Sequence, residues 1–513
     1  MLIKTFGSAI QGIVATTVTV EVAIEQGISF FLVGLPDNAV KESQQRISSA
    51  LNSLGYKIPG KKVVINMAPA DIKKEGSAYD LTIAIGILAA SEQISNSDKL
   101  NEYLIMGELS LDGSLRPIKG VLPIAMQAKS EGFKGFILPK SNAQEAAIVQ
   151  GLEVLGVDNL MQVINYFNGV GTIEKEIIDI DKEFEKGLND YILDFADVKG
   201  QQSVKRAMEV AAAGSHNILL VGAPGSGKTM LAKRLPSILP PLTVEESLET
   251  TKIHSVAGKI GIRSSLISIR PFRSPHHTIS DVALVGGGAY PQPGEISLAH
   301  NGVLFLDELP EFKRSVLEVL RQPMEERIIT ISRTKQTTEY PACFMLVAAM
   351  NPCPCGYYNH PTVACVCGKG AVNKYMGKIS GPLLDRIDIQ MEVVPVPFKE
   401  LSEDIQTERS IIIRQRVVNA RQMQKQRFKG IANVHCNSQM TPQLMKEVCR
   451  IGVSSKNLIL NAVKKFGLSA RAYDRILKVS RTIADLEESR DIEDKHVAEA
   501  IGYRKLDRES WGQ

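Results

Sequence analysis

The sequence has no apolar run long enough to span a membrane and little excess of charge of either sign. Its longest apolar run, residues 81–90, is half of the roughly 20 residues that a membrane helix needs. No basic segment followed by an apolar one opens the chain, so no secretion signal is predicted. Lys and Arg number 60 against 56 Asp and Glu, and the net charge of +4 does not by itself indicate a polyanionic partner. We expect a cytoplasmic protein that does not enter a membrane.

Cysteine is also scarce. There are seven, an odd number, and four of them fall between Cys353 and Cys367. In a reducing compartment this pattern excludes a disulfide scaffold and favours a metal site or buried thiols. Low-complexity tracts and fixed-period repeats are absent as well. A chain of 513 residues, 44% hydrophobic and 23% charged, is typical of a globular protein with about three domains of roughly 150 residues each.

Hydrophobic periodicity divides the chain into blocks and predicts a multidomain α/β protein. Residues 1–168 alternate short strands and helices, as in an α/β domain, and residues 169–190 are rich in Gly, Glu, Lys and Asp, as in a solvated linker. In residues 191–395, apolar strands alternate with helical stretches, the pattern of a largely parallel sheet. Residues 396–513 show only helical spacing, which predicts a helical domain.

The most specific motif is GAPGSGKT at 222–229, which lies between an apolar strand and a helix and fits G-x-x-x-x-G-K-[ST]. Backbone N–H groups of such a loop surround phosphates at a helix N-terminus. Lys228 offers a positive charge to the β- and γ-phosphates, and Thr229 offers a hydroxyl to Mg²⁺. The sequence therefore predicts an ATP and Mg²⁺ site. Its predicted residues are Gly222, Ala223, Pro224, Gly225, Ser226, Gly227, Lys228 and Thr229.

Two further apolar strands end in polar side chains. Asp307 and Glu308 follow residues 303–306; Asp307 suits Mg²⁺, and Glu308 suits the activation of the attacking water. Asn351 ends the next apolar stretch, and parallel strand order would bring its amide near the γ-phosphate. On the residues alone, a solvated carboxylate pair and a turn-forming Asn stay open as alternatives.

Together these motifs resemble the AAA+ ATPases of the magnesium-chelatase-like group, and more narrowly the YifB/ComM proteins. The resemblance covers essentially the whole chain. It rests on the motifs above and on distinctive sequence segments at 270–288, 300–312, 351–356, 380–386 and 468–471.

The resemblance implies roles for three residues. Asn351 would be sensor 1, Arg386 the arginine finger that reaches the γ-phosphate of a neighbouring subunit, and Arg471 sensor 2 in a helical lid. A guanidinium supplied by a neighbour requires a ring or at least a dimer, and we expect a homo-hexamer. On the residues alone, a salt bridge of Arg386 with Asp385 or Asp388 is the alternative.

Four cysteines are spaced to hold a metal. Nine residues separate the pair Cys353 and Cys355 from the pair Cys365 and Cys367, and four thiolates suit a tetrahedral structural Zn²⁺. The C-x-C spacing is tighter than usual, His360 is a rival ligand, and free buried thiols are an alternative. A catalytic metal is disfavoured because four thiolates leave no open position. We expect the metal to stabilise an insertion, residues 353–367, that follows sensor 1 in the sequence.

The N-terminal block resembles the Lon-type protease domain at residues 73–81 and 107–118. In that fold, a Ser nucleophile and a Lys base carry the chemistry. Here the matching positions hold Ala78 and Leu122, so we expect a proteolytically inactive domain; Ser77 is one residue out of register. By analogy with RadA-type recombination ATPases, the domain would serve as a scaffold for DNA binding and assembly.

Three segments are candidates for contact with nucleic acid. Residues 327–340 predict a hairpin with Arg333 and Lys335 at its tip, which the resemblance places in the ring pore. Residues 254–299 resemble a second insertion that faces the pore. Residues 409–429 hold seven Lys and Arg and no acidic residue, which indicates either a DNA-binding face or a plain solvated one.

The combined interpretation is a hexameric, ATP-driven DNA helicase or translocase. The resemblance implies branch migration in homologous recombination and natural transformation. The alternative is a chelatase-type subunit that uses ATP to remodel or metallate a partner protein. An ATP-dependent protease is a further rival, which Ala78 and Leu122 disfavour.

Overall fold

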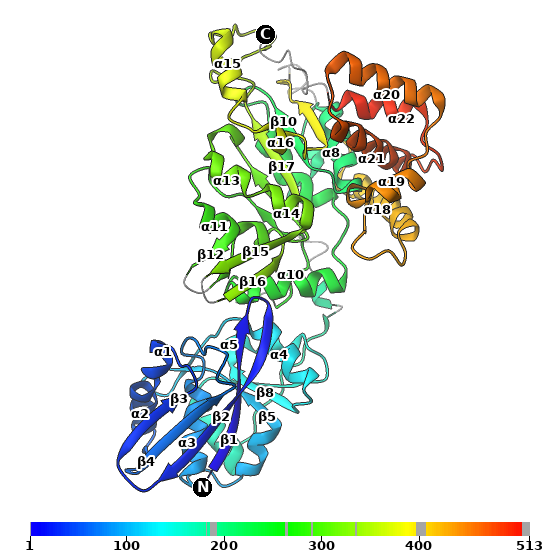
Figure 1. The fold of residues 1–513 in the computed structure, drawn as a ribbon. Helices are drawn as coiled ribbons and strands as arrows, with labels where there is room; N and C mark the ends of the chain where they lie inside the picture. The colour runs from blue at the N-terminus through cyan, green and yellow to red at the C-terminus, as the bar shows by residue number, and fades with distance from the viewer. Residues whose placement is uncertain are drawn as a thin grey trace. The chain divides into compact units, whose positions relative to one another are not determined.

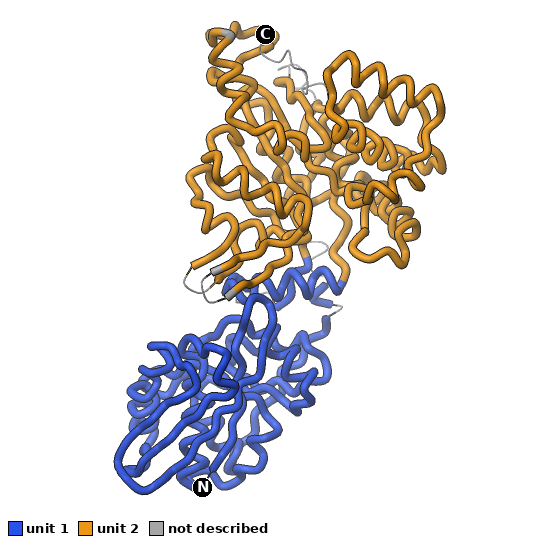
Figure 2. Tube along the Cα trace, in the orientation of Figure 1, with its two compact units in different colours: residues 1–186, 244–268 blue, residues 187–243, 269–513 orange. Residues whose placement is uncertain are grey.

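The computed structural model describes residues 2–180, 182–184, 192–261, 265–288, 291–333, 336–396 and 407–504 (Figure 1). The chain forms two compact units (Figure 2). The first unit combines residues 1–186 with 244–268, and the second unit combines residues 187–243 with 269–513. Among the described residues, no helix has both the length and the apolar character needed to cross a bilayer.

The first unit is built on a seven-stranded mixed sheet in the order β3-β4-β2-β1-β5-β8-β9. At its centre β1 and β2 form an antiparallel hairpin, whose tight connection includes Gly12 with φ of 63°. The strands β5, β8 and β9 continue the sheet in parallel. The strand bounds are β1 Leu2–Gln11, β2 Val14–Glu25, β3 Ser29–Val33, β4 Lys62–Ala68, β5 Tyr103–Ile105, β8 Gly135–Pro139 and β9 Glu153–Val157.

Helices pack on this sheet. The apolar run that is too short for a membrane forms α3 (Asp80–Ala90), in which every residue is buried, so it is a core helix. The helix that the sequence predicts near residues 38–54 is interrupted at Glu42. The remaining elements are α1 Asn38–Lys41, α2 Ser43–Ser53, α4 Val121–Ser130, α5 Lys140–Ala147, α6 Leu160–Asn168, and the small hairpin β6 Glu108–Leu109 and β7 Leu115–Arg116.

The described part of the predicted linker, residues 169–190, packs on the first unit. Ile173 and Ile178 contact its hydrophobic core. The N–H of Glu176 donates to the carbonyl of Val154 over 2.9 Å. The scattered apolar residues of this polar segment are therefore enough to anchor it, and the first unit extends beyond residue 168.

The segment 244–268 also belongs to the first unit, although the sequence predicts it within the nucleotide-binding block. It begins with α10 (Val244–Val256). Near the end of this helix, the carbonyl of Ser255 accepts the N–H of Gly120 over 3.1 Å, and the Ser255 hydroxyl donates to the carboxylate of Glu145. The chain therefore passes between the units three times, near residues 187, 243 and 269.

The second unit contains the predicted parallel sheet. Its five strands follow the order β11-β14-β17-β10-β18, and every neighbouring pair is parallel. All strands therefore end at one edge, where the residues that follow β10, β14 and β17 come together. The strand bounds are β10 Ile218–Val221, β11 Phe272–Arg273, β14 Val303–Leu306, β17 Met345–Met350 and β18 Ile389–Glu392.

Short helices and two hairpins accompany this sheet. The helices are α8 Gln202–Gly214, α9 Lys228–Arg234, α11 Asp281–Val285, α12 Glu295–Leu298, α13 Arg314–Glu318, α14 Arg321–Glu326, α15 Lys369–Met376 and α16 Gly381–Leu384. The hairpins are β12 Gly286–Gly287 with β13 Gln292–Pro293, and β15 Ile328–Arg333 with β16 Gln336–Pro341.

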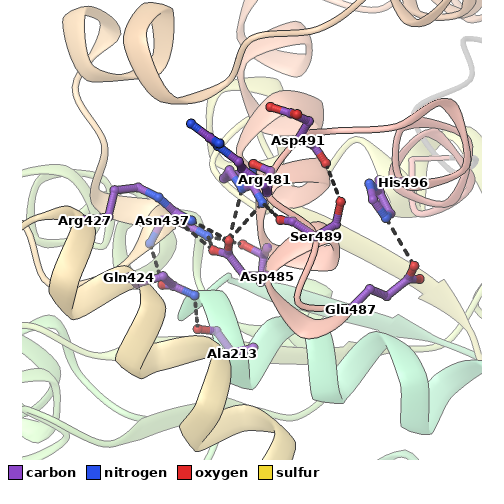
Figure 3. Close-up of polar contacts among 12 residues, drawn as sticks. Ala213, Gln424, Arg427, Asn437, Arg481, Asp485, Glu487, Ser489, Asp491 and His496 are labelled. Atoms are coloured by element: carbon purple, nitrogen blue, oxygen red, sulfur yellow. Dashed lines mark hydrogen bonds and ion pairs between the residues drawn. The ribbon is translucent and has the colours of Figure 1, made fainter.

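The C-terminal region is helical, as predicted. Its helices are α18 Ser410–Arg427, α19 Pro442–Val448, α20 Val453–Phe466, α21 Ala470–Leu486 and α22 Asp494–Gly502. Figure 3 shows the buried carboxylate of Asp485, which accepts hydrogen bonds from Arg427 at 2.6 and 2.9 Å and from Arg481 at 3.1 Å. Gln424 donates to the carbonyl of Ala213 over 3.1 Å, which attaches this region to α8.

Candidate nucleotide site

The phosphate loop starts at the buried end of β10. The N–H of Gly222 donates to the carbonyl of Met350 at the end of β17 over 3.1 Å. A Cβ added at Gly222 would lie 2.3 Å from the carbonyl oxygen of Val393, so only glycine fits there. Gly225 and Gly227 adopt φ of 75° and 93°, which L side chains rarely adopt. The glycines of the motif therefore permit the fold of this loop.

Lys228 donates hydrogen bonds to groups that follow two neighbouring strands, β10 and β17. Its Nζ donates to the carbonyls of Gly222 and Ala223 over 2.7 and 2.9 Å, and to the Oδ1 of Asn351 over 3.3 Å. Burial lowers the pKa of Lys228, while the nearby carboxylates act in the opposite direction. The structure thus brings Asn351 beside the phosphate-loop lysine, where sensor 1 is expected.

The second pair in the site is Thr229 and Asp307. The Thr229 hydroxyl donates to the Oδ2 of Asp307 over 2.7 Å. A hydroxyl and a carboxylate side by side are the oxygen ligands that Mg²⁺ takes. The loop itself also fits a phosphate, because the buried Oγ of Ser226 has no partner among the described residues. The residues present therefore suit a Mg²⁺-bound nucleoside triphosphate.

Glu308 follows directly and has a left-handed backbone with φ of 53°. Its side chain is 57% exposed, and one carboxylate oxygen lies 3.3 Å from the Nδ1 of His277. The sequence places His277 only within residues 254–299, a candidate segment for contact with nucleic acid. The parallel pairing of β11 with β14, which brings His277 to Glu308, has no local sequence signal.

Arg386 and Arg471, the predicted arginine finger and sensor 2, each contact a carboxylate of the second unit. Arg386 is buried, and its guanidinium lies 2.7 Å from a carboxylate oxygen of Glu325 and donates to the carbonyl of Pro382 over 2.7 Å. Arg471 is 57% exposed and lies 3.8 Å from Asp385. The two arginines therefore have different ion-pair partners, Glu325 and Asp385. The ion-pair partner of Arg386 is Glu325, which the sequence analysis did not identify.

Asp388 contacts the C-terminal helical region through Arg475 of α21. It is buried, and its oxygens lie 3.0 Å from the guanidinium of Arg475 and 3.4 Å from the Nδ1 of His216. Burial would raise the pKa of Asp388, but Arg475 and His216 hold it well below its usual range. The segment that carries Arg386 is therefore attached to α21 by a buried ion pair.

The four cysteines of the insertion form a cluster. The sulfur atoms of Cys353, Cys355, Cys365 and Cys367 all lie within 4.8 Å of one another, and three of the separations are 3.3, 3.6 and 3.7 Å. A tetrahedral Zn²⁺ with Zn–S bonds of about 2.3 Å requires separations of about 3.8 Å, so the set fits this ion. Backbone N–H groups lower the pKa of the Cys355 thiol to about 6, whereas for Cys365 and Cys367 one backbone hydrogen bond each is outweighed by burial and the neighbouring thiols, which raise their pKa values.

The insertion borders the phosphate loop. A Cβ added at Gly356 would lie 2.5 Å from the Cδ of Pro224. Asn351 precedes the first cysteine by two residues. The cluster can therefore brace both the loop and the sensor amide. His360 does not join the cluster; its Nδ1 accepts the N–H of Val363 over 3.0 Å.

The positions that match the Ser nucleophile and the Lys base of Lon-type proteases hold neither residue in the first unit. Ala78 is half-buried and Leu122 is fully buried. Ser77 donates its hydroxyl to the carboxylate of Glu108. The N–H of Leu122 donates to Glu145 over 2.9 Å, and Ser255 of α10 contacts the same carboxylate. The predicted position of the base is thus covered by a helix from the middle of the chain.

The predicted DNA contacts divide into two groups. Arg333 ends β15 of the predicted hairpin, and Lys335 lies outside the described residues. Arg270, in contrast, binds carbonyls of its own chain at 2.6, 2.7 and 3.3 Å, and Arg273 forms a bidentate pair with Glu295 at 2.6 and 2.8 Å. These two arginines stabilise the fold.

Part of the basic segment 409–429 is also committed to internal contacts. Arg416 contacts Glu209 and Glu408 at 2.5 Å, and Arg427 contacts Asp485 at 2.6 Å. The absence of acidic residues within the segment suggested a basic face, but acidic residues outside it pair with these two of its seven Lys and Arg.

Comparisons with known proteins cover most of the chain. Residues 194–401 match the family described as magnesium chelatase, subunit ChlI. Residues 20–142 match subunit ChlI of Mg-chelatase, and residues 407–504 match the C-terminal region of that subunit.

Individual relatives extend this result. The chain is 43% identical over 501 residues to the protein YifB of Escherichia coli, which covers 97% of this chain and 96% of that protein. It is 43% identical over 510 residues to the competence protein ComM of Haemophilus influenzae, which covers 98% and 97%. A partial similarity, 32% identical over 127 residues, relates 24% of the chain to 22% of Lon protease 2 of Bacillus subtilis.

Proposed function

Because the chain belongs to the magnesium-chelatase-like AAA+ family that includes YifB and ComM, we propose that it is an ATP-driven DNA helicase or translocase. It would promote branch migration during homologous recombination and natural transformation. The observation that carries ATP hydrolysis is the convergence of Lys228, Asn351, Thr229 and Asp307 at one sheet edge.

Each group has a role in phosphoryl transfer. The loop and Lys228 bind the β- and γ-phosphates, and Thr229 with Asp307 holds Mg²⁺, which neutralises phosphate charge when bound. Glu308 orients and deprotonates the attacking water, and Asn351 stabilises the γ-phosphate. Most of the catalysis then comes from positioned charge.

The two arginines have different roles in this proposal. Arg386 supplies a guanidinium to the γ-phosphate of the neighbouring subunit, and Arg471 acts as sensor 2 from the helical region. A homo-hexameric ring provides each site with such a neighbour.

The DNA substrate has separate support. A relative with 43% identity over nearly its whole length is a competence protein. Arg333 and Lys335, the two basic residues of the predicted hairpin, supply the cations for phosphate contacts. The first unit serves as a scaffold, and a structural Zn²⁺ on the four cysteines braces the phosphate loop.

The test is the ATPase rate of the full chain with single-stranded, duplex and four-way-junction DNA at two salt concentrations. We expect stimulation that weakens with salt, because phosphate contacts release counterions. Branch migration is followed on a junction with one labelled strand. Lys228→Ala controls for contaminating ATPases. The double variant Arg333→Ala with Lys335→Ala should keep the DNA-free rate and lose most of the stimulation. A rate that no DNA alters would contradict the DNA motor.

The second candidate is a chelatase-type subunit that uses ATP to remodel or metallate a partner protein. Three matches to magnesium chelatase subunit ChlI favour it. It predicts an ATPase that DNA leaves unchanged and that a partner protein stimulates. The two candidates therefore differ in the first experiment.

A further inference from the structure

Arg386 lies at the sheet edge opposite the phosphate loop of its own chain. It precedes β18, and the first residue of β18, Ile389, pairs with Ile218, the first residue of β10. The two strands are parallel, and the phosphate loop follows the other end of β10. At about 3.3 Å per residue, the four residues of β10 separate the two edges by roughly 10 Å. The contacts that hold the segment of Arg386 are therefore distinct from those of the chain's own nucleotide site.

Asn217, directly before β10, fixes the backbone of this segment. Its Nδ2 donates to the carbonyl of Arg386 over 3.1 Å. Its backbone carbonyl accepts the N–H groups of Asp388 and Ile389, each over 3.0 Å. Its Oδ1 accepts the N–H of Leu346 in β17 over 2.9 Å. One asparagine thus joins the segment of Arg386 to two neighbouring strands of the sheet.

Asp388 strengthens this connection. Its buried Oδ2 accepts the backbone N–H of Asn217 over 3.1 Å, and its Oδ1 lies 3.0 Å from the guanidinium of Arg475 in α21. A buried ion pair of this kind resists displacement, because breaking it would leave a buried charge without compensation. The chain is therefore held at Arg386 and again two residues later. The Arg386 side chain, in contrast, pairs with the half-exposed Glu325.

We propose that Asn217 is a positioning residue for Arg386, which fixes its backbone so that its guanidinium reaches the γ-phosphate bound by the neighbouring subunit. The inference rests on the proposed function, in which Arg386 acts in that site. A fixed backbone reduces the freedom that the guanidinium loses when it leaves Glu325 for the phosphate. Asn217 thus contributes to turnover in the neighbour's site through Arg386.

The test compares kcat and KM for ATP in full-length Asn217→Ala and Asn217→Asp. In Asn217→Asp the carboxylate can accept the N–H of Leu346 but cannot donate to the carbonyl of Arg386. Its charge also repels the nearby Asp388, so both effects act on the segment of Arg386. We expect each variant to lower kcat about tenfold, as for a misplaced catalytic group, while KM changes less than about twofold.

Asn142→Ala is the matched control. The side chain of Asn142 also bonds two backbone groups, the N–H and the carbonyl of Ile118 at 2.8 and 3.1 Å, but in the first unit. Its loss should lower the melting temperature and leave kcat at the wild-type value.

Mixing each Asn217 variant with Lys228→Ala distinguishes a misplaced arginine from a damaged site. Lys228→Ala subunits lack a working phosphate loop but keep Asn217 and Arg386. Beside such a neighbour, the intact site of an Asn217 variant receives a well-placed guanidinium. The mixture should therefore turn over faster than the sum of its separate components. A defect in the variant's own site or in its folding would give no such gain.

The outcomes separate this inference from the function on which it rests. No gain when Arg386→Ala is mixed with Lys228→Ala contradicts the action of Arg386 on a neighbour, and hence that part of the proposed function. A gain for Arg386→Ala without one for the Asn217 variants overturns the positioning role alone. Wild-type kcat in Asn217→Asp also overturns it, because the bond to Leu346 would then be sufficient. If Asn217→Ala does not fold, Asn217→Asp, which has nearly the same shape, carries the test.

Discussion

The guanidinium of Arg386 lies 2.7 Å from the carboxylate of Glu325, and only 7% of its side chain is exposed. An arginine that serves the site of a neighbouring subunit must reach beyond its own surface. The pair with Glu325 therefore competes with the proposed role of Arg386 and must open when subunits assemble. Glu325 is half-exposed, so the competition is modest.

Glu325→Gln should make the ATPase more active at low protein concentration. Removing the carboxylate frees Arg386, and because Glu325 is half-exposed, a contribution of about 1 kcal/mol, or up to about fivefold, is expected for this pair. The measurement is the specific ATPase rate against protein concentration. The adjacent Glu326→Gln, whose residue contacts Gln322 instead, is the control. An unchanged concentration dependence would show that the pair does not restrain assembly.

Arg386→Ala should lose most of its ATPase and regain part of it when mixed with Lys228→Ala. In a mixed ring, Lys228→Ala subunits contribute an intact Arg386 to the intact phosphate loops of their neighbours. The measurement is the ATPase rate across mixing ratios. Mixing Arg386→Ala with Glu308→Gln, which also keeps its arginine, should give the same recovery. No recovery in either mixture would argue that Arg386 acts within its own subunit.

Protein purified without chelators should contain about one zinc ion per chain, since four thiolates complete a tetrahedral site. Cys355→Ser should lose this metal. It should also lower the ATPase rate, because Gly356 borders Pro224 of the phosphate loop. Elemental analysis and a chromogenic zinc assay measure the metal.

Cys449→Ser is the control for the zinc prediction, because this buried cysteine lies outside the cluster. It should keep the metal. Stoichiometric zinc in Cys355→Ser, or none in the wild type, would contradict the four-thiolate site.

Glu145→Gln should raise the melting temperature more at about pH 8 than at about pH 5. Burial raises the pKa of Glu145, although Ser255 and the N–H of Leu122 partly offset this. A raised pKa in the folded state favours the protonated form, so its contribution to stability is present at low pH. It is lost as the pH rises through the folded pKa, whereas Gln stays neutral.

The measurement is thermal unfolding of both proteins across this pH range. Glu131→Gln, at an exposed position of the same unit, should keep the wild-type pH dependence. A difference between Glu145→Gln and wild type that does not grow with pH would show that Glu145 is not a destabilising buried charge at neutral pH.

Much of the site was predictable because its parts are contiguous motifs. The phosphate loop, the carboxylates after residues 303–306 and Asn351 each follow an apolar strand. Parallel strands end at one edge, so the sequence predicted that these groups meet, and the Lys228–Asn351 contact of 3.3 Å agrees. The cysteine cluster was predictable for a similar reason, since ligand spacing along the chain is short.

The partners of isolated charged residues were not predictable. Asp385 and Asp388 were the nearest candidates for Arg386, yet Glu325, some sixty residues away, is its partner. Similarly, residues 409–429 suggested a basic face, but Glu209 and Asp485 neutralise two of its arginines. Charge composition within a segment does not contain this information.

The sequence by itself determined the family, the order of the elements and the nucleotide-binding groups, because these depend on local spacing and periodicity. Only the tertiary structure decided that residues 244–268 belong to the first unit and that His277 meets Glu308. Both depend on which surfaces far apart in the chain are complementary. Such complementarity is a property of packed side chains and of strand pairing, and no local pattern encodes it.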